Sequence, residues 1–261
     1  MRYQVFEGDP AQVRRTAEQR VRGAIEHDRL RLLFQPIVDL TGGRPAGAEA
    51  LLRLAEGDRL VPPGLFLDVA ERAGLAVDLD AWVVEEAIAQ LRHWSEQTEQ
   101  VEPGGAPWLS INLAARTPAD QRVPRRLVEA VKRGELPRER LRVELTAAHF
   151  TGATPATESA VRNLQVNGVQ VGLQGYGTDP AAAEVTDRFP LDFVKIDPSA
   201  AAGPDVTVRQ LIDTAHSRKI QVIAERIESP RQARRLREYG SDFAQGFHFG
   251  RPGEPTRIVR G

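Results

Sequence analysis

The fold is decided by the segment LRVELTAAHFTGATPATESAVRNLQVNGVQVGL, residues 141–173. Two short apolar runs, 141–145 and 169–173, flank a stretch over residues 154–167 with a helical pattern. A strand, a helix and a second strand in this order form a parallel pair joined by a right-handed crossover. The segment therefore predicts an α/β fold built on parallel strands.

The same alternation continues on both sides of this segment. Further strands are expected at residues 108–113, 193–196, 221–224 and 243–244, and helices at 11–26, 65–73, 80–94, 124–133, 181–189, 206–218 and 230–239. Residues 31–38 and 46–54, which flank the turn Thr41-Gly42-Gly43, predict an opening hairpin. The total of about eight strands favours one (β/α)₈ TIM-type barrel. A doubly wound open sheet is the alternative, although no strand precedes a dinucleotide-binding glycine pattern.

Composition limits the classes of function. The chain has 261 residues, 35 basic and 36 acidic side chains and no cysteine, which excludes a cysteine nucleophile and any thiolate metal site. The balanced charge argues against a nucleic acid polymer as partner. Because no apolar run is long enough to cross a membrane and the polar N-terminus does not resemble a signal peptide, the sequence predicts a cytoplasmic protein with no membrane partner.

Polar side chains occur at or near the ends of most predicted strands. They are Glu49, Asn112, Glu144, Gln174, Lys195, Glu225 and Gln245. The carboxyl ends of barrel strands meet at one mouth, so we expect a functional site there. Carboxylate and amide oxygens suit hard cations such as Mg²⁺, Mn²⁺ or Ca²⁺. Arg53, four residues after Glu49 on the same strand face, suits a phosphate or a guanine, and the set as a whole indicates phosphate chemistry.

At this point the motifs resemble a known family. The string FQPIVDLTGGRPAGAEALLR (34–53) resembles the opening of EAL domains, which are bacterial phosphodiesterases and receptors for cyclic di-GMP. Further similar motifs are PPGLFLDVAERAGL (62–75), WLSINLA (108–114), VELT (143–146), DFVKID (192–197), IAERIES (223–229) and QGFHFGRP (245–252). The resemblance implies a modified barrel whose first strand is antiparallel. It also implies one domain over residues 11–256, led by a helix within residues 11–30, with tails at 1–10 and 257–261.

The resemblance also implies roles for individual residues. Glu49, Asn112 and Glu144 match the ligands of a first metal ion, Glu225 matches a ligand of a second, and Lys195 and Gln245 match residues that position the attacking water. The positions that match ligand-binding residues are Gln35, Pro36, Leu51, Arg53, Phe66, Glu228, Phe247 and Pro252.

The chain departs from the family pattern where hydrolysis depends on it. Gln174 and Gly175 stand where active members have paired aspartates, and Ala147 stands where they have a glutamate. Arg226 replaces a glycine between the two glutamates of the IAERIES motif. Two-metal hydrolysis needs two cations held close together, and an amide and a glycine do not supply the lost carboxylates. We therefore expect Lys195, Glu225 and Gln245 to be remnants of a catalytic site, with no cofactor required.

Three functions remain open from the sequence. The first is a cyclic di-GMP receptor that does not hydrolyse its ligand, and the second is a protein-interaction module that no longer binds the ligand. The third is a slow phosphodiesterase that forms linear pGpG and recruits Mg²⁺ or Mn²⁺ through Asp179 or Asp197. An unidentified protein partner and a homodimer are the further expectations.

Overall fold

A computed structural model describes residues 10–98, 106–114, 120–150, 153–198 and 205–255. The predicted tails lie outside the described residues, except for Pro10, where the first helix begins. The domain limits at residues 11 and 256 therefore stay predictions.

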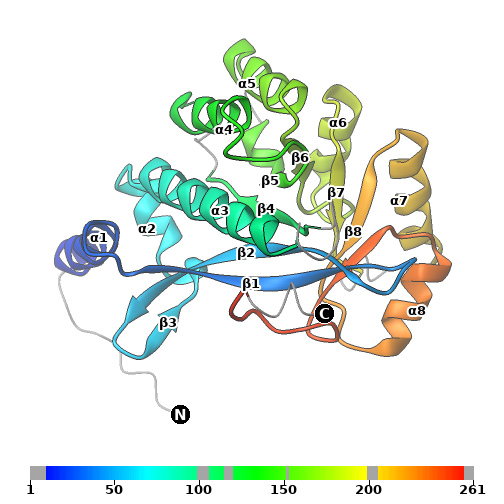
Figure 1. Cartoon of the computed structure of the whole chain (residues 1–261), viewed down its shortest axis with the longest axis horizontal. Coiled ribbons are helices and arrows are strands. Elements are labelled where there is room, and N and C mark those ends of the chain that lie inside the picture. Colours follow the sequence, from blue (N-terminus) through cyan, green and yellow to red (C-terminus); the bar gives the residue numbers. More distant parts are fainter. Residues whose placement is uncertain (1–9, 99–105, 115–119, 151–152, 199–204, 256–261) are drawn as a thin grey trace.

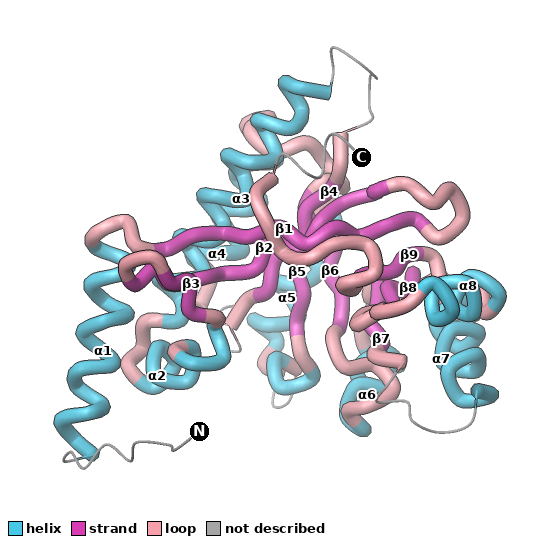
Figure 2. The backbone as a smooth tube through the Cα atoms, turned by 90° about the horizontal axis from the view of Figure 1, so that it is seen from below, coloured by secondary structure: helices cyan, strands magenta, loops and turns pink. Residues whose placement is uncertain are grey.

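Eight strands close into a barrel, and Figure 2 shows the strands in the interior with helices around them. They are β1 (Leu30–Asp39), β2 (Pro45–Glu56), β4 (Trp108–Asn112), β5 (Leu141–Leu145), β6 (Gln170–Leu173), β7 (Phe193–Ile196), β8 (Gln221–Ala224) and β9 (Phe243–Gln245). β1 is antiparallel to both of its neighbours, β2 and β9, and the other pairs within the barrel are parallel. The modified barrel with an antiparallel first strand is confirmed.

Helices lie outside the strands (Figure 1). The third to the eighth cover the barrel, and the first two lie beside the extended end of the opening hairpin. They are α1 (Pro10–Glu26), α2 (Leu67–Arg72), α3 (Ala76–Thr98), α4 (Arg122–Lys132), α5 (Pro155–Val166), α6 (Pro180–Arg188), α7 (Asp205–Ser217) and α8 (Pro230–Glu238). Three of them begin at a side-chain cap followed by proline: Thr154, Asp179 and Ser229 accept backbone N–H groups of the first turn. None of the helices in the described ranges combines the length and apolar character needed to cross a membrane.

The opening hairpin is longer than the sequence predicts. β1 and β2 extend beyond the barrel, and a ninth strand, β3 (Arg59–Val61), pairs with the end of β2. Leu30, Leu54, Phe66 and Leu79 pack there with α1, α2 and α3 in a separate apolar cluster (Figure 1). The sequence prediction missed β3 because three residues after the turn at Gly57 give too short a run to show alternation.

Alternate residues along each barrel strand point into the barrel. Their side chains form two layers, one above the other. Trp108, Phe193, Phe243 and the buried Arg142 fill the lower layer, called here the floor, at the starts of their strands. The Arg142 guanidinium lies 3.8 Å from the ring centroid of Trp108, and burial lowers its pKa to about 10. Residues two positions further along point the same way. They reach the opposite end of the barrel, called here the mouth.

Gly172 on β6 makes room for this floor. A Cβ atom at position 172 would lie 2.4 Å from the Phe193 ring, which is closer than packed carbon atoms approach.

We predict that Gly172→Ala destabilises the barrel by about 1–3 kcal/mol, because the added methyl forces the Phe193 ring out of place. Gly64→Ala is the matched control, since a Cβ there meets nothing within 4 Å. The measurement is the free energy of unfolding in urea. Equal stability of the two variants would show that the floor adapts freely.

Candidate functional site

The site is centred on the ammonium group of Lys195 in the mouth of the barrel. Lys195 lies two residues after Phe193 on β7, so its side chain also faces inward, and it is 0% exposed. Its Nζ lies 3.0 Å from Glu49 Oε2, 2.9 Å from Glu144 Oε2 and 2.8 Å from Glu225 Oε1. One buried cation thus contacts carboxylates from β2, β5 and the residue after β8.

Neutral donors complete the coordination of Glu49. Asn112 Nδ2 donates to Glu49 Oε1 over 2.7 Å, and Gln245 Nε2 donates to Glu49 Oε2 over 2.6 Å. The same Gln245 nitrogen lies 3.1 Å from Gln35 Oε1, so β1 and β9 join the network. Both oxygens of Glu49 therefore accept hydrogen bonds from within the protein.

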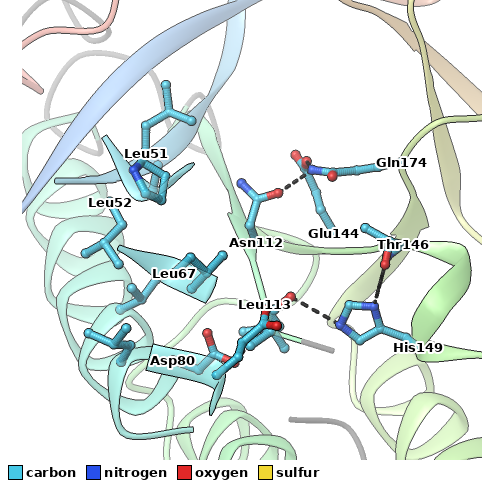
Figure 3. Close-up of a pocket in the computed structure, with 16 residues that line it drawn as sticks. Leu51, Leu52, Leu67, Asp80, Asn112, Leu113, Glu144, Thr146, His149 and Gln174 are labelled. Atoms are coloured by element: carbon cyan, nitrogen blue, oxygen red, sulfur yellow. Dashed lines mark hydrogen bonds between the residues drawn. The ribbon is translucent and has the colours of Figure 1, made fainter. Parts of the chain in front are cut away.

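Gln174 is likewise a neutral hydrogen-bond donor to Glu144. Its Nε2 donates to Glu144 Oε2 over 2.6 Å and also to Asn112 Oδ1, and Figure 3 shows the two amides pointing toward one another. The second Glu144 oxygen accepts the hydroxyl of Ser110. An N–H group therefore occupies the position between two predicted metal-ligand side chains.

Burial and crowding separate the acidities of the two glutamates. Burial and the nearby charge of Glu49 raise the pKa of Glu144 to about 7. Burial also tends to raise the pKa of Glu49, but Lys195, Asn112 and Gln245 outweigh it and lower that pKa. The surrounding carboxylates raise the pKa of Lys195 despite its burial, so the ammonium stays charged at neutral pH.

A divalent cation does not fit this arrangement. The four carboxylate oxygens of Glu49 and Glu144 and the amide oxygen of Asn112 already accept N–H or O–H donors. A cation at this point would face the Gln174 N–H group and the Lys195 ammonium. Within the described ranges, no group of three or more His, Cys, Asp or Glu side chains is arranged to hold a metal ion.

Two cavities flank the cluster formed by Lys195 and its three carboxylates. The first, of about 370 Å³, is mainly apolar, and its lining includes Leu51, Asn112, Glu144 and Gln174 (Figure 3). The second, of about 640 Å³, is lined by Gln35, Glu49, Glu225, Arg226, Glu228, Gln232, Gln245, Gly246 and Phe247. The lining sets bring together most of the residues that the sequence singled out.

Other predicted residues lie outside these cavities. Phe66 is 5% exposed and packs in the apolar cluster beside α2, and Ala147 is buried in the main core. Half-buried Arg53 donates a hydrogen bond to the Leu52 carbonyl and interacts electrostatically with Glu49. Pro252 belongs to the segment at 250–253 that follows β9, and Pro36 lies next to this segment. The ligand-binding roles of these residues stay predictions.

His149, a residue with no predicted role, is buried beside the first cavity. Its Nδ1 accepts the Thr146 N–H over 3.1 Å, so its Nε2 donates to the Leu113 carbonyl over 3.1 Å (Figure 3). It therefore ties the residues after β4 to those after β5. The Thr-x-x-His spacing, a variant of the helix capping box, was the signal in the sequence.

We predict that Lys195→Met lowers the free energy of unfolding by about 3–5 kcal/mol, because it leaves buried carboxylates without their cation. The control is Lys132→Met, which removes an exposed lysine of α4 and should change stability by less than about 0.5 kcal/mol. Urea denaturation at neutral pH measures both values. Equal stability of the two variants would contradict this account of the cluster.

We predict a pH-dependent contribution from His149. Burial lowers its pKa below 6.5, so the folded protein favours the neutral ring. The stabilisation that the neutral His149 ring contributes is complete at pH values above the pKa of His149 in the unfolded state. It is lost as pH falls through the lower pKa of His149 in the folded state. The wild type should therefore lose stability relative to His149→Gln between about pH 7 and pH 5. A stability difference that stays constant over this pH range would contradict this.

Comparison with known proteins gives the relationship of the chain. The sequence model of the EAL domain family matches residues 18–252. The signaling protein YkoW of Bacillus subtilis is 30% identical over 265 residues, covering 98% of this chain and 32% of YkoW. The chain thus spans about a third of the length of that relative.

Solved structures agree with this match. The EAL enzyme Bd1971, in its cAMP and cyclic-di-GMP bound form, aligns with a TM-score of 0.87 and 25% identity over 97% of this chain and 69% of that chain. The c-di-GMP complex of PaMucR phosphodiesterase aligns with a TM-score of 0.82 and 27% identity over 93% of this chain and 99% of that chain. The family match covers the whole barrel, and this chain belongs to the EAL domain family.

Proposed function

We propose that this EAL domain binds cyclic di-GMP and does not hydrolyse it. The observation that carries the proposal is the Gln174 amide, whose Nε2 donates to both Asn112 and Glu144. With it in place, the oxygens of Glu49 and Glu144 and the Asn112 amide oxygen all accept donors from the protein, and the cavities on either side stay open to a ligand.

The two cavities support a dinucleotide as ligand. Their sizes fall in the range of small-molecule sites, and the cluster between them is lined by polar groups. In the larger cavity, Glu228 and Gln245 offer the carboxylate and amide groups that pair with purine edges. Phe247 is 50% exposed there and presents a ring for base stacking. Two similar structures, Bd1971 and PaMucR, hold cyclic di-GMP, which is why we choose this dinucleotide.

The residues after β6 support the absence of hydrolysis. Two-metal phosphodiester cleavage requires two cations to activate water and to stabilise the charged oxygens. Gln174 presents a donor rather than an anion, and Gly175 has no side chain to bind a cation. Gly175 also has φ +73°, a conformation that glycine adopts without strain. Lys195 supplies a positive charge from within the protein to the carboxylates of the site.

The test is isothermal titration calorimetry with cyclic di-GMP, once with EDTA and once with Mg²⁺. We expect the same affinity in both, because no ligand contact passes through a metal. Arg53→Ala should weaken binding at least about tenfold, since an arginine bonded to phosphate or guanine contributes a charge-assisted contact. Arg59→Ala on the exposed β3 is the matched control and should bind as the wild type does.

Two outcomes would contradict the proposal. No heat at high micromolar ligand would exclude the receptor and favour the interaction module. Release of pGpG during long incubation with Mn²⁺, abolished by Glu49→Ala, would instead show a phosphodiesterase.

A further inference from the structure

Arg226 has an unusual backbone conformation. Four non-glycine residues in the described ranges have positive φ: Asp28, Glu139, Lys219 and Arg226. The first three lie in turns that lead into β1, β5 and β8, whereas Arg226, with φ +55°, follows the end of β8. A non-glycine residue held in this region at a site is a reason to look for a function.

The conformation holds the Arg226 side chain at the mouth of the barrel. Arg226 Nη1 lies 2.9 Å from Asp197 Oδ2, just beyond the end of β7. The Arg226 side chain is still 74% exposed, and Arg226 lines the larger cavity next to Glu225. The ion pair therefore fixes the direction of the side chain while leaving most of it accessible to a ligand.

The charge of this cavity makes the position of Arg226 important. Three carboxylates line it, those of Glu49, Glu225 and Glu228, and Arg226 is the one cation in the same lining set. Lys195 lies beneath the cavity, fully buried and bonded to three carboxylates, so it does not reach an entering anion. A phosphodiester that enters this cavity is repelled unless a cation at the mouth offsets the carboxylates.

We propose that Arg226 binds a phosphate of the ligand at the mouth of the larger cavity and so determines the preference of this site for an anionic dinucleotide. This inference rests on the proposed function and deepens it. The planar guanidinium keeps Asp197 on one nitrogen and offers its remaining N–H groups to phosphate oxygens, a geometry that lysine does not reproduce.

The experiment is calorimetric titration of the full chain with cyclic di-GMP. Arg226→Gly removes the cation and keeps a residue that adopts positive φ without strain. We expect it to bind about tenfold or more weakly, with a smaller dependence of affinity on salt, as for the loss of a charge-assisted phosphate contact. Arg226→Lys should recover part of the affinity, because it restores the charge but not the fork.

Lys219→Gly is the matched control, because it also removes a cation from a residue with positive φ, at the other end of β8. It should bind as the wild type does. If the wild type binds and Arg226→Gly matches this control within about twofold, or binds more tightly, the inference is wrong while the receptor proposal stands. If the wild type itself fails to bind, the proposed function is wrong and this inference is lost with it.

Discussion

The site depends on one interaction, the contact of the buried Lys195 ammonium with Glu49, Glu144 and Glu225. Removing an ammonium from water costs several kcal/mol, and only well-placed counter-charges repay that cost. The carboxylates come from strands far apart in the sequence, so the contact forms only when the barrel is closed. The same contact places an internal positive charge among the three carboxylates of the mouth.

Gln174 places an uncharged amide beside Glu144 and Asn112. The raised pKa of Glu144 and the charge of Lys195 reduce the negative charge that the three carboxylates bring to the cluster. A site in this state is suited to recognition of a ligand, because hydrogen bonds within the protein fix the side chains of Glu49, Glu144 and Asn112 in direction. In our proposal, the charge of an anionic ligand is recognised at the edge of the mouth, where Arg226 lies beside Asp197.

Much of the fold could be predicted because the local pattern and the tertiary structure agree. The boundaries expected for the strands at 141–145, 193–196 and 221–224 coincide with β5, β7 and β8. The polar residues of the mouth could also be found, since Glu144 and Lys195 follow inward-facing Arg142 and Phe193 by two residues. β3 and the role of His149 could not, because a three-residue strand and a buried ring are defined by their neighbours.

The sequence by itself determined the alternation of strands and helices, the family resemblance, and the residues Ala147, Gln174 and Gly175 on which the expected loss of hydrolysis rests. Each of these depends on residue identity and on spacing along the chain. Only the tertiary structure decided that the Gln174 amide donates to two of the expected ligands, that Phe66 belongs to the core, and that Arg226 pairs with Asp197. These contacts join residues that are far apart in sequence, and their geometry is set by closure of the barrel, which no local pattern specifies.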